Sequence, residues 1–313
     1  MSTTVKVKKK SLGLRLKKDL SNFGGAYLMG IPVIIFYIIF HYKPLFGALI
    51  AFKDYKPRRG IWGSPWVGFK HFQSFFDSFY FERLIGNTLT ISLAGLLFAF
   101  PIAIIFALLI NEIQNNKFKR SIQTISYMPH FISTVVICSM IRLFVDSNGF
   151  IVAILEAVGF NIGQSLLNLP KAFVPVYVLS DIWQQTGWNC IIYLAALGGI
   201  DPELYEAARI DGANRWKQTL HVTLPGILET VVLLLILRVG SLMGVGHEKI
   251  ILLYNDYTME TADVISSYVY RRGLINGDYS FSTAVGLFNT VVNVILLILV
   301  NKVVEKMNDG QGL

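Results

Sequence analysis

The 313-residue sequence contains 53% hydrophobic and only 15% charged residues, and its mean hydropathy is +0.53. This composition is too apolar for an ordinary soluble domain of that length and indicates a chain that lies in a lipid bilayer. The formal charge of +8 does not indicate a nucleic-acid partner, because the basic residues cluster at the N-terminus and between apolar runs. Cys138 and Cys190 both fall inside apolar segments, so they indicate neither a disulfide framework nor a metal site, and we predict two small core residues.

The chain begins with a basic region, predicted to be a cytoplasmic tail over residues 1–24. A basic region followed by an apolar run superficially resembles a signal peptide. The apolar run over 26–40 nevertheless continues without an A-x-A-like cleavage site. It is therefore expected to remain as a membrane span.

Six apolar segments are long enough, or nearly so, for a hydrocarbon core that needs about 20 helical residues. They lie near 25–45, 86–110, 122–145, 172–198, 226–246 and 283–301. Because they lack period-2 alternation, and because every backbone group must be satisfied in lipid, they predict helices rather than a barrel. The expected fold class is an all-α integral membrane bundle of six transmembrane helices, with bends at the prolines inside the spans.

This bundle implies a simple domain organisation and a topology. We expect a first helix with an extracytoplasmic loop over 25–82, a core of five helices over 83–304 and a cytoplasmic tail over 305–313. If the basic N-terminus is cytoplasmic, the linkers 111–121 and 199–225 are cytoplasmic too. The outer segment 53–83 is also basic, so charge alone leaves the orientation weakly determined.

The loop between the fourth and fifth spans carries the strongest local signals. Asp201 before Pro202 is a good helix start, because the carboxylate can cap free N–H groups and proline suits the first helical position. Gly212 permits a sharp turn into a second short helix, expected to end before Pro225. One face of the first helix is predicted to dock closely against another surface; it is made of Leu204, Ala207, Ala208 and Asp211.

The same loop resembles a known family. Glu206-Ala207-Ala208, three residues, Gly212, nine residues, Val222, one residue and Leu224-Pro225 are similar to the EAA signature of type I permeases of ATP-binding-cassette (ABC) importers. The resemblance implies a cytoplasmic coupling helix that sits in a cleft of a separate ATPase subunit. The residues that it nominates for ATPase coupling are Glu206, Ala207, Ala208, Asp211, Gly212, Leu224 and Pro225.

Three further stretches are similar to narrower branches of that family. The wording of residues 204–213 resembles the carbohydrate importers, and the stretches 52–55 and 262–274 resemble the subgroup for complex oligosaccharides or polysaccharide fragments. The resemblance implies a second, related permease subunit, two ATPase subunits, an extracytoplasmic solute-binding protein and a sugar cargo. It also implies a bacterial cytoplasmic membrane with both termini cytoplasmic.

The sequence holds no G-x-x-x-x-G-K-[ST] run, no H-E-x-x-H, no C-x-x-C and no G-x-S-x-G. We therefore expect no catalytic residue, no metal site and no cofactor of its own, so the chain is not expected to be an enzyme. ATP and Mg²⁺ are expected to be bound by the partner ATPase subunits.

The fourth span contains residues suited to a sugar, whose hydroxyls need hydrogen bonds and whose apolar faces stack on aromatic rings. Such polarity is costly in a bilayer and predicts a water-facing surface. The alternative is that the rings pack on lipid or helices while the amides bond across helices. The candidates are Asp181, Trp183, Gln185, Thr186, Trp188 and Asn189.

Arg238 is predicted near the bilayer centre in the fifth span. Either it pairs with Glu229, Asp181 or Glu248 as a strut, or it faces the pathway. The family resemblance nominates this span for substrate contact, through Arg238, Ser241, Gly244 and His247.

Two rival functions remain open at this point. One is an ABC importer for another solute, such as a peptide or a polyamine; the lack of clustered pathway carboxylates disfavours a polycation. The other is a stand-alone secondary transporter, which needs intramembrane ionisable residues and usually inverted repeats. Asp181 and Arg238 permit it, but no internal repeat is found.

Overall fold

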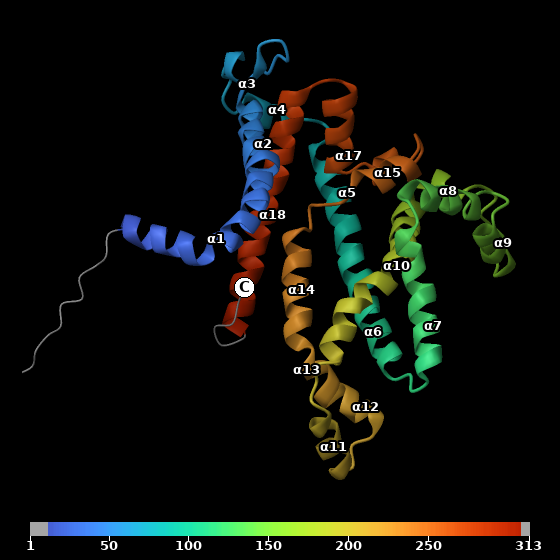
Figure 1. The fold of residues 1–313 in the computed structure, drawn as a ribbon. Coiled ribbons are helices and arrows are strands. Elements are labelled where there is room, and N and C mark those ends of the chain that lie inside the picture. The colour runs from blue at the N-terminus through green and yellow to red at the C-terminus, as the bar shows by residue number, and fades with distance from the viewer. Residues whose placement is uncertain (1–11, 308–313) are drawn as a thin grey trace, which may run out of the picture.

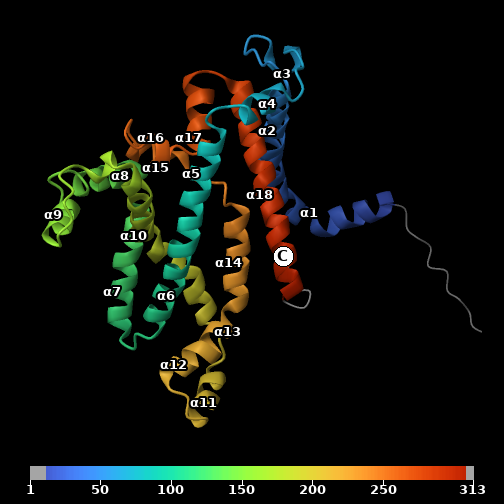
Figure 2. The same cartoon turned by 180° about the vertical axis from the view of Figure 1, so that it is seen from behind.

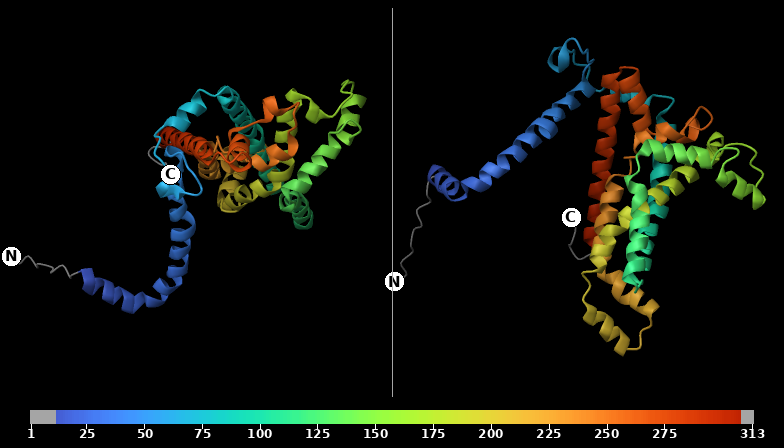
Figure 3. Two further views of the ribbon diagram at one scale, coloured as in Figure 1. Left: turned by 90° about the horizontal axis from the view of Figure 1, so that it is seen from above. Right: turned by 45° about the vertical axis from the view of Figure 1, so that its right-hand side comes forward.

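The computed structural model describes residues 12–307, so residues 1–11 of the predicted N-terminal tail and residues 308–313 of the C-terminal tail lie outside the described residues. Within this range the chain is helical, and no strand forms beyond one isolated antiparallel bridge between Lys53 and Trp66. The predicted all-α fold class is confirmed. The helices form an elongated bundle from which the N-terminal helix projects (Figures 1 and 3).

The N-terminal third contains α1 (Leu12–Tyr37), α2 (Lys43–Leu45), α3 (Gly60–Gly63), α4 (Lys70–Phe76), α5 (Phe81–Ala94) and α6 (Phe100–Asn111). The middle contains α7 (Asn116–Tyr127), α8 (Thr134–Phe144), α9 (Phe150–Ala157), α10 (Pro170–Leu197), α11 (Pro202–Ile210), α12 (Arg215–Gln218) and α13 (Leu224–Gly226). The last third contains α14 (Leu228–Gly240), α15 (His247–Leu253), α16 (Met259–Ala262), α17 (Ile265–Tyr270) and α18 (Tyr279–Met307).

Three helical stretches among the described residues are long and apolar enough to cross a membrane: Tyr27–Phe52, Phe81–Asn111 and Tyr279–Lys306. Two bent helix pairs would each supply another span, and α10, with 28 residues, is also long enough to cross. The last helix runs past residue 304, which had been predicted as the end of the membrane core.

The third span, predicted near 122–145 with a bend at its proline, has that bend but different bounds. The helix begins earlier, at Asn116, because the side chain of Asn115 accepts hydrogen bonds from the backbone of Lys117 and Phe118. It then bends by 100° between Phe131 and Thr134. Pro129 lies in the short 3₁₀ segment at this bend and cannot donate the backbone bond that a straight helix requires.

The fifth span also differs from the prediction, because α14 ends at Gly240 rather than near residue 246. Arg238 therefore lies in the last turn of a shortened helix and not in the middle of a continuous one. The side chain of Asn293 on α18 accepts a hydrogen bond from the backbone N–H of Met243, at 2.9 Å, and so satisfies part of the exposed backbone. Non-helical backbone at membrane depth is tolerated where protein or a water-filled cavity surrounds it.

The bundle has two distinct ends (Figures 1 and 2). One end carries α11, α12 and α13 together with the turn from α6 to α7, and Arg215 of α12 pairs there with Glu112 beyond α6, at 3.4 Å. The other end carries α3, α4 and α17. The linkers predicted on one side of the membrane therefore share one end of the molecule.

A buried ion pair stabilises the second end. Asp263 is fully buried, and both of its carboxylate oxygens accept hydrogen bonds from Arg271, at 2.9 and 2.6 Å. Burial lowers the pKa of Arg271, but the hydrogen bond and the charge of Asp263 outweigh it and raise that pKa above its ordinary value. Asn87 of α5 donates to the backbone carbonyls of Glu260 and Asp263, which ties α5 to this end.

Candidate functional site

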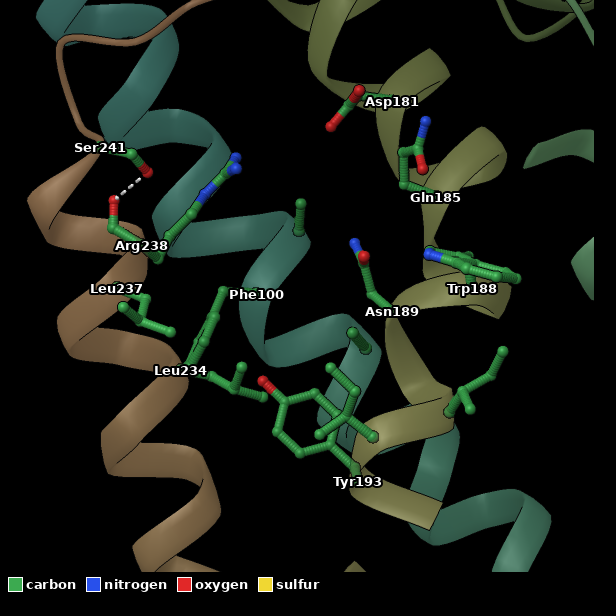
Figure 4. A pocket seen from close by; sticks show the side chains of 14 residues that line it. Phe100, Asp181, Gln185, Trp188, Asn189, Tyr193, Leu234, Leu237, Arg238 and Ser241 are labelled. Carbon is green, nitrogen blue, oxygen red and sulfur yellow. Dashed lines mark hydrogen bonds between the residues drawn. The ribbon is translucent and has the colours of Figure 1, made fainter. Parts of the chain in front are cut away.

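A hollow of about 620 Å³ lies between α10, α14 and the junction of α5 with α6 (Figure 4). Its size falls in the range of small-molecule sites. Its lining is apolar toward one end, with Phe100, Tyr193 and Leu234, and polar toward the other. A smaller hollow of about 210 Å³ shares Asp181, Arg238 and Ser241 with it, so the two adjoin at these side chains and are together called the hollow.

One face of α10 supplies most of the polar lining. Asp181, Gln185, Trp188 and Asn189 all border the hollow, because a spacing of four, seven and eight residues brings side chains to one side of a helix. Figure 4 shows the side chains of Asp181 and Asn189 pointing from α10 toward α14. The indole of Trp188 is 42% exposed, so an aromatic surface is open to a ligand.

His130, at the bend of the third span, fixes two of these side chains. Its ring stacks on Trp188, with ring centroids 4.4 Å apart and planes tilted by 1°. Its Nδ1 lies 2.7 Å from the side-chain oxygen of Gln185. The bend after Pro129 brings His130 against α10.

Three of the predicted pathway residues do not border the hollow. Trp183 and Thr186 lie roughly 200° and 140° around α10 from Asp181, so the helix points them away from the hollow. The hydroxyl of Thr186 is buried and has no hydrogen-bond partner among the described residues. His247 stacks on Tyr270 at 5.1 Å and borders a different pocket. The structure does not bring these three residues to the hollow, and their role in the substrate pathway stays a prediction.

Arg238 and Ser241 border the hollow from α14, opposite α10. Among the described residues the guanidinium of Arg238 forms no ion pair and no hydrogen bond, although Ser241 donates to its backbone carbonyl at 3.1 Å. The strut alternatives with Glu229, Asp181 or Glu248 are therefore not found. A Cβ atom at Gly95 would lie 3.3 Å from Nη2 of Arg238, so this glycine leaves the guanidinium its room.

Asp181 instead pairs with a residue that the sequence analysis did not single out. Nζ of Lys249 on α15 lies 3.6 Å from the Asp181 carboxylate and 4.9 Å from the ring centre of Tyr177. The only available sequence signal was a lysine soon after the fifth span, which reads as an ordinary loop residue. The turn between α14 and α15 brings it back against α10.

The second candidate site is the segment over residues 199–226 at the opposite end, here called the coupling segment. Asp201 caps α11 by accepting a hydrogen bond from the backbone of Glu203, at 2.9 Å, as predicted. Gly212 has a φ of +75°, a left-handed conformation that favours glycine, and it turns the chain into α12. Glu206, Ala207 and Asp211 are exposed on α11, and so are the large side chains of Leu204, Ile210 and Trp216.

The inner side of the coupling segment is tied to the bundle. The hydroxyl of Tyr205 lies 3.1 Å from the hydroxyl of Thr223, and Ala208 is half-buried on the same side of α11. The predicted end of the second helix before Pro225 is wrong, since helical structure continues to Gly226. Pro225 has no backbone N–H, and the π-helical turn over Thr219–Thr223 that precedes it accommodates the missing hydrogen bond. Leu224 is half-buried, and Pro225 is exposed.

Comparison with known proteins decides the family. The model of the family described as binding-protein-dependent transport system inner membrane component matches residues 99–309. The chain belongs to this family. It is 45% identical to Protein LplB of Bacillus subtilis (strain 168), over 92% of this chain and 90% of that protein.

Three further similarities each cover at least 90% of the chain. It is 43% identical to the polygalacturonan/rhamnogalacturonan transport system permease protein YteP of Bacillus subtilis (strain 168), over 90% of this chain and 88% of that protein. A crystal structure of a bacterial ABC transporter that imports the acidic polysaccharide alginate matches with a TM-score of 0.85 and 42% identity, over 94% of this chain and 99% of the other. A crystal structure of a bacterial alginate ABC transporter in complex with an alginate pentasaccharide-bound periplasmic protein matches with a TM-score of 0.86 and 41% identity, over 96% of this chain and 100% of the other.

These findings confirm the predicted family, an integral membrane permease of an importer with the type I permease fold. The rival hypothesis of a stand-alone secondary transporter is wrong, because the family works with a binding protein. The permease is a transporter subunit rather than an enzyme in its own right. Within residues 12–307 no group of three or more His, Cys, Asp or Glu side chains is placed to hold a metal ion.

Proposed function

We propose that this permease imports an acidic oligosaccharide through the hollow, and that the guanidinium of Arg238 holds a carboxylate of the cargo. The observation that supports this is the unpaired charge of Arg238 beside the exposed ring of Trp188 and the side-chain amide of Asn189. A sugar face stacks on the indole, its hydroxyls bond to the amide, and its carboxylate meets the guanidinium. The related alginate importer acts on an acidic polysaccharide.

The rest of the importer follows from surfaces that this chain leaves uncovered. The most apolar 18 residues of the N-terminal span Tyr27–Phe52 include no buried residue, and a second, related permease would cover such a span and close the hollow. An extracytoplasmic solute-binding protein would deliver the sugar at the end with α3 and α17. The periplasmic protein bound to the related alginate transporter supports that partner.

One of two ATPase subunits would dock on the coupling segment, where Leu204 and Ala207 are exposed, and the other on the equivalent segment of the second permease. They would bind ATP and Mg²⁺ and hydrolyse the nucleotide, while this chain holds no cofactor. The end that carries the coupling segment is then cytoplasmic in a bacterial cytoplasmic membrane, and both termini lie on that side. Closure of the ATPases draws the coupling segments together and reorients the two permeases, so that the hollow faces alternate sides of the membrane.

Reconstituted transporter, loaded with an acidic oligosaccharide or with its carboxyl-reduced counterpart, tests the cargo. Arg238→Met should lower the ratio of acidic to neutral uptake by about 10- to 100-fold, because a hydrogen bond to a charged group contributes about 1.5–3 kcal/mol. Arg238→Lys should keep part of the ratio, since it retains the charge without the bidentate geometry. An unchanged ratio in Arg238→Met would refute the proposal. Preferred uptake of a peptide would favour the rival cargo, and a polyamine is disfavoured by the same positive charge.

A further inference from the structure

The side chain of Lys249 is buried beside the hollow without bordering it. Only 7% of the residue is exposed, and its Nζ forms no hydrogen bond within residues 12–307. Its two electrostatic partners are the Asp181 carboxylate, at 3.6 Å, and the face of the Tyr177 ring, at 4.9 Å. A buried ammonium group is costly unless an opposite charge pairs with it. The pair therefore stabilises the charged forms of both Lys249 and Asp181.

Asp181 and Arg238 face each other across the hollow (Figure 4). They are the two charged side chains that border it, one from α10 and one from α14. Their charges cancel, and an unpaired carboxylate opposite an unpaired guanidinium would attract it. Lys249 adds one positive charge behind Asp181, so the group of three has a net charge of +1.

We infer that Lys249 is a specificity-determining residue, which neutralises Asp181 so that the guanidinium of Arg238 stays available to a carboxylate of the cargo. This inference rests on the proposed function. Lys249 acts through Asp181 and does not itself touch the cargo. The pair also joins α15 to α10. The charge of Lys249, which we infer to set the cargo preference, therefore lies where the segment after the fifth span contacts the fourth span.

Lys249→Met provides the direct test, because methionine keeps a long apolar side chain over Tyr177 while removing the charge. For uptake of an acidic oligosaccharide by the reconstituted transporter, KM should rise at least tenfold with kcat nearly unchanged. The ratio of acidic to neutral uptake should fall by a similar factor. Lys171→Met is the matched control, since Lys171 is an exposed lysine on the same α10 away from the hollow, and it should leave KM unchanged.

The double variant Lys249→Met with Asp181→Asn distinguishes charge balance from simple support. It removes both members of the pair, leaves Arg238 unopposed and should restore the KM for the acidic cargo to within about threefold. A merely structural lysine would lower assembly or kcat for both cargoes, and the second substitution would not rescue it. If Lys249→Met alone does not assemble, the double variant still decides: loss of the acidic preference in it overturns the inference.

The outcomes separate this inference from the proposed function. If Arg238→Met keeps the wild-type preference for acidic cargo, the proposed function fails. If Arg238 is required but Lys249→Met takes up acidic cargo with the wild-type KM, only the inference about Lys249 is overturned.

Discussion

The coupling segment and the hollow both adjoin α10, but they gather their residues from very different distances along the chain. The coupling segment is built from consecutive residues, with a cap at Asp201 and a left-handed turn at Gly212. The hollow combines the junction of α5 with α6, one face of α10 and the broken end of α14. The conformation of the coupling segment is set by neighbouring residues, so a substitution elsewhere in the chain should leave it intact. The hollow instead depends on how closely its helices approach one another.

The largest expected effect is at the contact that sets this approach. A Cβ atom on Gly187 would lie 2.1 Å from the backbone oxygen of Ser126, so Gly187→Ala forces α7 and α10 apart. We expect most of the folded permease to be lost, as measured by size-exclusion chromatography in detergent. Gly86→Ala on α5 is the control, because nothing lies within 4 Å of the added atom. Normal yield of Gly187→Ala would show that the helix contact is not rigid.

The coupling segment should respond to a different kind of change. Gly212→Val places a β-branched residue at a φ of +75°, which costs about 1–2 kcal/mol, and the turn should relax into another path. We expect roughly tenfold less uptake with the membrane bundle still assembled, since no neighbour lies within 4 Å of that site.

Gly163→Val is the matched control for this turn. Gly163 has a φ of +59° and similarly open surroundings, but it lies in the loop before α10 at the far end. Its substitution brings comparable strain and should leave ATPase coupling intact. Equal loss of coupling in both variants would contradict the assignment of the coupling segment.

A smaller effect is expected where the bend of the third span supports the hollow. His130→Ala removes both the stacking on Trp188 and the contact with Gln185, which together contribute about 1 kcal/mol, so uptake should fall about three- to tenfold. His130→Phe keeps a ring without the polar nitrogen and should lie between His130→Ala and wild type. Basal ATPase activity should be unaffected, and its loss in either variant would indicate a structural role instead.

These contrasts also explain what the sequence could predict. The helix start at Asp201, the turn at Gly212 and the polar face of α10 rest on local spacing, and each is found in the structure. The bend at Pro129 was expected from the proline, although its angle of 100° was not, and the early end of α14 depends on what surrounds the backbone, so its apolar run alone misplaces it. Lys249 lies beyond sequence reasoning, because its partner is 68 residues away in the chain (249 minus 181).

The smallest effect is expected at the ion pair that links the two linkers at the coupling end. Arg215 and Glu112 lie 3.4 Å apart, with 68% and 47% of their side chains exposed, so water and salt screen their attraction. In the isolated permease, a double-mutant cycle with Arg215→Ala and Glu112→Ala should give a coupling energy of at most about 0.5 kcal/mol. Measured in the complete transporter, a larger value would mean that a docked ATPase excludes water from this pair. The Arg215–Glu112 pair would then couple the coupling segment to the turn between α6 and α7 in the complete transporter. Only in the isolated permease would the coupling segment be independent of the rest of the bundle.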